Sequence, residues 1–330
     1  MLQLKYKEIP EHTRKFMKKA IDSDYDYYDD AVNKIKELFP SQEVHILNSA
    51  NSCIFTITEA LPEPILVPDE GGWNGLQRSA KILNKQVQEI STSNGIINTE
   101  NLSKYFENND VGSLYITSLS AYTAEQPIKE IYKLCNLYDV VFILDISGSL
   151  CDKKLSNTKY ADIQVSSTGS PKIVNIENGG FINNITKKIK LNNHLLKTFK
   201  ADNITCAGIY ENIDYAEQTY NKTLNANTYL KKQLINKLKD DKIHNIIHEN
   251  KHGLNVIITA ESKSKAKKLS YNIRTQLSIT KNKSIITTGP NYNRLKQPCI
   301  CIETKNLDPS SLTLDNMDKL VDIIINATKE

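Results

Sequence analysis

Residues 161–182 read ADIQVSSTGSPKIVNIENGGFI and form the most informative segment of the chain. It begins as an apolar strand, passes through a turn rich in hydroxyl side chains, presents Lys172, and enters a second strand through Gly179 and Gly180. An amine that forms an imine needs a fixed position and a lowered pKa, which burial or neighbouring positive charge provides. Nearby hydroxyls and backbone N–H groups can hold a phosphate, and glycines let a strand pass close to a flat ligand. The stretch therefore indicates either a reactive lysine in a ligand site or a surface lysine in a polar loop.

Short apolar runs alternate with helical segments from about residue 41 to residue 190. The expected strands are Val44–Leu47, Ile65–Val67, Val87–Ile90, Leu114–Thr117, Val140–Leu144, Ile163–Ser166 and Phe181–Ile182. The helices expected between them are Cys53–Leu61, Gly75–Leu83 and Pro127–Tyr138. Because buried parallel strands are rich in Val and Ile and are connected by helices, this pattern predicts an α/β domain with a mostly parallel sheet flanked by helices.

The two ends of the chain predict further units. Residues 1–40 are expected to form an N-terminal helical segment, and residues 191–330 a smaller C-terminal α+β domain with a connecting helix. The elements expected in these units are helices at Glu11–Ile21 and Tyr27–Leu38, a long helix at Ile213–Leu238 that continues weakly to His252, a strand at Leu254–Thr259, a helix at Lys263–Leu277, strands near Ile285–Thr288 and Cys299–Glu303, and a helix at Leu314–Ala327. A ligand site is expected in the cleft between the large domain, residues 41–190, and the C-terminal domain.

The composition is that of an ordinary globular protein, with 330 residues of which 39% are hydrophobic and 24% charged. The formal net charge is only +4 and the lysines are interleaved with acidic residues, which argues against a nucleic-acid partner. No apolar stretch approaches the length that spans a bilayer, so no membrane partner is expected. The six cysteines lie in apolar or strand-like runs, which favours free thiols and gives no metal site. We therefore expect a soluble, cytoplasmic protein.

Residues 161–182 resemble the Schiff-base segment of fold-type I pyridoxal-phosphate-dependent enzymes, the aspartate-aminotransferase-like superfamily. A Ser-x-x-x-x-Lys pattern followed by two glycines is similar to the corresponding segment of the DegT-type sugar aminotransferases. The sequence SPKIVNI is similar to that of lyases related to tryptophanase. The resemblance implies that Lys172 holds pyridoxal 5'-phosphate as a Schiff base. It also implies that Ser167 is a phosphate ligand, with Ser170 as an alternate.

Asp145 ends the apolar run DVVFILD, 27 residues before Lys172. The carboxyl end of a buried parallel strand is where ligands bind in such sheets. The resemblance implies that this carboxylate pairs with the pyridine nitrogen of the cofactor, although an Asp that caps the next turn would look the same. Many relatives place His or Gln three residues after this Asp, and this chain has Gly148 there. Contact with the phenolic oxygen of the cofactor must then come from elsewhere or be missing.

Two further stretches match the family in the expected order. The turn at residues 48–52 is similar to the family's phosphate-binding turn, which makes Ala50, Asn51 and Ser52 phosphate-site candidates, although a run of Ser and Asn helix caps looks the same. Trp73, the only Trp in the chain, lies in a glycine-rich turn where relatives often stack an aromatic on the cofactor ring. A Trp that anchors the loop to the core is an equal alternative. Residues 118–127 are expected to line the same crevice without an assigned role.

The chain contains few candidates for the residue that holds a substrate carboxylate. Amino-acid substrates are usually held by an Arg–carboxylate pair, and the late strand beginning at Cys299 contains no Arg. Arg294 could replace it, or it could be a loop Arg paired with Glu303. His244, His248 and His252 recur every four residues, but a solvated helix face is favoured over a metal site there.

The resemblance implies an enzyme that acts on an amino acid or amine through Lys172. An aminotransferase is expected first, with a β/γ-eliminating lyase as the alternative, because the same residues serve both reactions. A non-catalytic or regulatory protein that keeps the fold is the third possibility, since the His or Gln at Gly148 and the late Arg are absent. The resemblance also implies a homodimer.

Overall fold

The computed structural model describes residues 1–290 and 294–329. Its larger body is built on a seven-stranded sheet with the order β2-β10-β9-β8-β5-β3-β4. Only β10 runs antiparallel to its neighbours in this sheet. The strands are β2 (Glu43–Leu47), β3 (Ile65–Pro68), β4 (Val87–Ile90), β5 (Ser113–Thr117), β8 (Val141–Asp145), β9 (Ile163–Ser167) and β10 (Gly180–Asn184). The predicted α/β fold with a mostly parallel sheet is therefore confirmed.

Helices cover both faces of this sheet because its strands are apolar on both sides. In β8, Phe142 and Leu144 enter one core while Val141 and Ile143 enter another, as the twofold alternation of a strand requires. The first core also takes residues from α2, α5, α6 and α8, and the second from α3, α4 and α7. The helices of this body are α1 (Glu11–Ile21), α2 (Tyr28–Leu38), α3 (Ala50–Ala60), α4 (Gly75–Ile82), α5 (Thr99–Asn108), α6 (Ile128–Leu137), α7 (Asn193–Thr198) and α8 (Asn203–Asn212).

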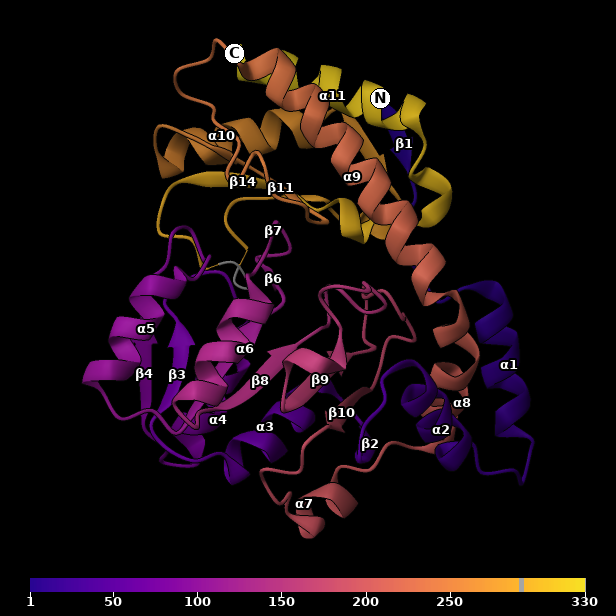
Figure 1. The fold of residues 1–330 in the computed structure, drawn as a ribbon. Helices are drawn as coiled ribbons and strands as arrows, with labels where there is room; N and C mark the ends of the chain where they lie inside the picture. Colours follow the sequence, from indigo (N-terminus) through magenta and orange to yellow (C-terminus); the bar gives the residue numbers. More distant parts are fainter. Residues whose placement is uncertain (291–293, 330) are drawn as a thin grey trace.

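The second body has its own core around a three-stranded antiparallel sheet with the order β11-β14-β13. The long helix α9 rises from the larger body into this second one, where it packs beside α11 (Figure 1). Its elements are α9 (Ala216–Leu238), β11 (Val256–Thr259), α10 (Lys263–Arg274), β12 (Leu277–Ile279), β13 (Ile286–Thr287), β14 (Cys299–Ile302) and α11 (Leu314–Thr328). The N-terminal strand β1 (Leu2–Leu4) pairs with β12, so the first residues of the chain join the C-terminal core.

The weak continuation of the long helix to His252 is wrong, because α9 ends at Leu238. The carboxylate of Asp241 accepts the backbone N–H groups of Ile243 and His244, which turns the chain away from the helix. Ile246 then forms an antiparallel bridge with Ile258 of β11. The three histidines therefore do not share a helical face.

Every strand expected in the larger body is present within one or two residues of its expected bounds. Three of its helices, α5, α7 and α8, were not expected from the sequence. Helix α8 has no distinct apolar face, because both the sheet side and the α1 side of it are buried. No helix within the described ranges has the length and apolarity needed to cross a bilayer.

Candidate active site

A cavity of about 460 Å³ opens at the carboxyl ends of the parallel strands. Thr117, Asp145 and Ser167 end the adjacent strands β5, β8 and β9, and all three line it. Ligands bind at this edge of open α/β sheets because the strand ends and the following loops meet there. The other lining residues are Ser49, Ala50, Asn51, Ile54, Gly72, Trp73, Leu119, Ala121, Tyr122, Ser147, Gly148, Gly169, Ser170, Pro171, Lys172, Glu177, Asn178, Gly179, Glu303, Lys305 and Asn306.

Lys172 lines this cavity and is only partly exposed. Its Nζ donates a hydrogen bond to the hydroxyl of Tyr122. Burial lowers the pKa of the Lys172 ammonium, and the carboxylates of Asp145 and Glu303 oppose this shift. A lysine with a lowered pKa in a cavity keeps more of its amine in the neutral, nucleophilic form than a surface lysine does.

Asp145 is 7% exposed and is held by two hydrogen bonds. Its Oδ1 accepts the backbone N–H of Ser147 at 2.8 Å, and its Oδ2 accepts the hydroxyl of Tyr115 at 2.9 Å. Tyr115 lies on the adjacent strand β5 and was not identified from the sequence. Burial and the nearby carboxylate raise the pKa of Tyr115 well above its ordinary value, so this phenol remains a donor. The carboxylate is therefore fixed in the lining of the cavity.

The N-terminus of α3 forms another wall. Ser49 caps the helix by accepting the backbone N–H of Ser52 at 3.1 Å, and Ala50 and Asn51 line the cavity. A Cβ added to Gly180 would lie 2.8 Å from the backbone nitrogen of Ala50, so only glycine lets β10 pass this close to the helix end. A helix N-terminus with small neighbours can bind an anion through its N–H groups and dipole. The hydroxyl of Ser52 is instead directed to Asn48 and Ser49.

Trp73 stands beside this helix end. Its indole N–H donates to Oδ1 of Asn51 at 3.1 Å, and its ring lines the cavity. Ser167 and Ser170 lie on the same cavity, and Ser167 also accepts the backbone N–H of Gly169. The structure therefore brings all but two of the residues predicted for the site to one cavity, the exceptions being Ser52 and Arg294.

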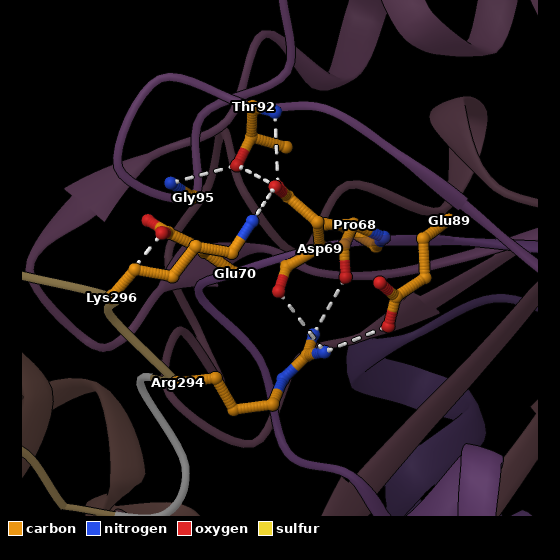
Figure 2. A network of polar contacts seen from close by, with 8 residues as sticks. All are labelled: Pro68, Asp69, Glu70, Glu89, Thr92, Gly95, Arg294 and Lys296. Atoms are coloured by element: carbon orange, nitrogen blue, oxygen red, sulfur yellow. Dashed lines mark hydrogen bonds and ion pairs between the residues drawn. The ribbon is translucent and has the colours of Figure 1, made fainter.

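Arg294 is held by the loop that carries Trp73. Its guanidinium donates to the carbonyl oxygens of Gly72 and Pro68, each at 2.8 Å, and lies 4.0 Å from Glu89. Lys296 pairs with Asp69 nearby, as Figure 2 shows. The expected alternative, a pair between Arg294 and Glu303, is not found among the described contacts. Arg294 thus ties the residue 294–297 loop to the loop after β3.

The C-terminal body lines the cavity with three residues that were not predicted for the site. Glu303, Lys305 and Asn306 follow β14, are buried and line the cavity. Lys305 Nζ donates to Asn306 Oδ1 at 2.6 Å, and Asn306 Nδ2 donates to Glu303 Oε2 at 2.8 Å. The available signal was an acidic and a basic residue directly after the last strand.

Part of the chain matches a known protein family. Residues 217–325 match the profile of the MJ1341 family C-terminal domain, which is about a third of the chain. A search of curated protein sequences gives no match.

Several solved structures share the fold over nearly the whole chain. A serine palmitoyltransferase from S. paucimobilis, described with a bound PLP–myriocin aldimine, has a TM-score of 0.76 and 10% identity, and the match covers 99% of this chain and 87% of that one. A NifS-like protein from Rickettsia africae has a TM-score of 0.74 and 13% identity, with 100% of both chains covered. PseC of Helicobacter pylori, an aminotransferase involved in pseudoaminic acid biosynthesis, has a TM-score of 0.75 and 12% identity, with 99% of both chains covered. The chain has the fold of the fold-type I pyridoxal-phosphate-dependent enzymes.

Proposed function

We propose that this protein is a pyridoxal-phosphate-dependent enzyme that acts on an amino acid or amine through Lys172. The observation that carries this proposal is that the Lys172 amine, the buried Asp145 carboxylate and the N-terminus of α3 line one cavity. These groups come from three separate parts of the chain, and the shared fold of the solved structures supports the same assignment.

The residues present fit this cofactor. An aromatic aldehyde needs an amine to attach to, and Lys172 has a pKa lowered by burial. A pyridine nitrogen needs a carboxylate partner, and Asp145 is held rigidly by Tyr115 and Ser147. A phosphate needs N–H and hydroxyl donors, and we assign it to Ala50, Asn51 and Ser167, with Ser52 and Ser170 as neighbouring candidates. The ring of Trp73 would cover the flat ligand from the side of the glycine-rich loop.

When bound, pyridoxal phosphate supplies an aldehyde that condenses with amines and a ring that withdraws electrons from the substrate Cα. The chain's own residues do the rest. Lys172 would hold the aldehyde, and its Nζ would take and return the Cα proton of a bound substrate. Asp145 keeps the ring nitrogen protonated by offering it a fixed negative charge.

Within this class we propose an aminotransferase, with a lyase as the alternative outcome of the test. PseC, one of the structures that share the fold, is described as an aminotransferase, and the hydroxyl-rich segment before Lys172 is compatible with either reaction. The experiment is to mix the holoprotein with a panel of amino donors and analyse the cofactor and products. Accumulation of pyridoxamine phosphate supports transamination, whereas release of pyruvate or ammonia without it supports elimination. Neither product with any donor, in a chain that binds the cofactor, would favour a regulatory protein.

We further propose that the protein works as a homodimer in the cytoplasm. Free cysteines, five of them buried, suit a reducing compartment. Sedimentation of the purified chain with and without pyridoxal phosphate tests the dimer. A monomer that binds the cofactor at full occupancy would exclude a cofactor site formed by two copies of the chain.

A further inference from the structure

The ring of Tyr122 fills the space above Gly148. A Cβ added to Gly148 would lie 2.8 Å from Cδ1 and from Cε1 of this ring, which is closer than real Cβ atoms approach carbon. Gly148 follows Asp145 by three residues, and both line the cavity. Position 148 therefore has no room for a side chain while Tyr122 keeps its place.

Tyr122 is held in that place by unusual backbone. Ala121 and Tyr122 both have positive φ, +50° and +60°, a region that L-residues seldom adopt. The carbonyl oxygen of Tyr122 accepts the backbone N–H groups of Leu254 and Asn255, at 2.7 and 3.0 Å. The N–H of Ala121 donates to the carbonyl of Gly71 at 3.0 Å. Contacts from both bodies thus fix a strained turn whose effect is to direct one phenol into the cavity.

The hydroxyl of Tyr122 accepts a hydrogen bond from Nζ of Lys172. The same Nζ lies 4.9 Å from the centroid of the Tyr122 ring, and Nζ of Lys305 lies 4.8 Å from it. Tyr122 is consequently the side chain that holds the reactive amine, while Asp145 lies in the lining of the same cavity.

We propose that Tyr122 fixes the Lys172 amine in its reactive position, and that Gly148 is glycine to make room for this ring. The proposal rests on the proposed function only in taking Lys172 as the reactive amine. It explains the departure at position 148: a phenol from another loop occupies the place where relatives carry His or Gln. A phenol that holds the lysine is also positioned to contact the phenolic oxygen of a ligand joined to it.

The charged groups around Lys172 determine in which direction its pKa should move when the Tyr122 hydroxyl is removed. The groups that act on its ammonium are the carboxylates of Asp145 and Glu303, which favour it, and the nearby cations of Lys305 and Lys7. Burial raises the pKa of Tyr122, so its oxygen accepts from the ammonium as a neutral phenol. Removing that oxygen takes away an acceptor that favours the charged form, and the pKa of Lys172 should fall further.

The test is trace acetylation of the full-length chain with acetic anhydride at a series of pH values, with Lys172 modification measured by peptide mass spectrometry. Tyr122→Phe should lower the apparent pKa of Lys172 and so raise its acetylation by about tenfold at pH values below that pKa. Gly148→Ala should shift it in the same direction because the added methyl group displaces the ring. Tyr105→Phe is the matched control, since this phenol bonds Gln88 away from the cavity.

A Lys172 profile unchanged in Tyr122→Phe, in a chain with wild-type circular dichroism, overturns the proposal. A shift in Tyr122→Phe without one in Gly148→Ala overturns the part that concerns Gly148. If Tyr122→Phe does not fold, the Lys172 acetylation profile of Gly148→Ala is the test, and an unchanged profile overturns the proposal. The readout needs no cofactor, so a chain that shows the shift but does not bind pyridoxal phosphate refutes the proposed function and leaves this inference standing.

Discussion

The hydroxyl of Tyr115, in the middle of β5, donates a hydrogen bond of 2.9 Å to the carboxylate of Asp145, at the end of the adjacent parallel strand β8. Both side chains are buried, and burial holds the pKa of Tyr115 well above its ordinary value. The phenol therefore stays protonated, and its hydrogen bond fixes the direction of the carboxylate. A second oxygen lone pair remains for a ligand in the cavity.

Replacing Asp145 by Asn should weaken binding of pyridoxal phosphate by about 30-fold, or ~2 kcal/mol, because the ring nitrogen loses its charged partner. Tyr115→Phe should cost less, since the backbone N–H of Ser147 still holds the carboxylate. Titration followed by visible absorbance measures both. Equal affinity of Asp145→Asn and the wild-type chain would remove Asp145 from the cofactor site.

Ser167→Ala should lower the affinity for pyridoxal phosphate about tenfold, the effect of about one lost charge-assisted hydrogen bond. Its affinity for pyridoxal, which lacks the phosphate, should stay unchanged. The ratio of the two affinities isolates the phosphate contact from other effects of the mutation. A parallel loss for both ligands would show that Ser167 acts on the fold of the loop and not on the phosphate.

Arg294→Ala should destabilise the chain by about 2 kcal/mol, because the carbonyls of Pro68 and Gly72 lose a charged donor. Urea unfolding followed by fluorescence reports on this directly, since Trp73 is the only Trp and lies in the same loop. Arg294→Lys keeps the charge but not the forked set of donors, so its unfolding free energy should lie between those of the wild-type chain and Arg294→Ala. We expect the KM for amino donors to change little; a large rise in KM with unchanged stability would instead support Arg294 as the substrate-carboxylate residue.

Lys7→Met should stabilise the chain at neutral and acidic pH. Lys7 is 4% exposed, its Nζ has no hydrogen-bond partner among the described residues, and burial and then Lys305 lower its pKa from 10.5 to about 7. The unfolded chain binds this proton more readily, so the destabilisation is fully present below about pH 7 and fades as pH rises toward 10.5.

The gain in unfolding free energy for Lys7→Met should be roughly 2–4 kcal/mol at pH 6 and near zero at pH 10. Denaturant unfolding at both pH values measures it. Lys5→Met, two residues away and exposed, is the matched control and should show neither the gain nor its pH dependence.

The sequence was informative where local chemistry and spacing carry the site. The hydroxyl turn, Lys172 and the two glycines lie within one short segment, and the apolar run before Asp145 marks a buried strand end. These features could be read without knowing which strands are neighbours. The strand pattern likewise predicted the sheet, because buried strands are short, apolar and separated by helices.

The rest depends on contacts between distant segments. Tyr115 could not be assigned to Asp145 before β5 and β8 were known to be adjacent. Tyr122 reaches the cavity through a turn with two positive φ angles, and this turn could not be predicted because Ala and Tyr seldom adopt such angles. Glu303 and Lys305 reach the cavity only because the C-terminal body folds over the strand ends. Gly148 was the one local feature of the sequence that is consistent with another side chain occupying the space beside it.

The most direct measurement is borohydride reduction of the chain after incubation with equimolar pyridoxal phosphate, followed by peptide mass spectrometry. We expect loss of the visible band and one phosphopyridoxyl group per chain on the peptide that contains Lys172, with neither band nor label in Lys172→Ala. Label spread over surface lysines, to the same extent in the wild-type and Lys172→Ala chains, would contradict the assignment of Lys172.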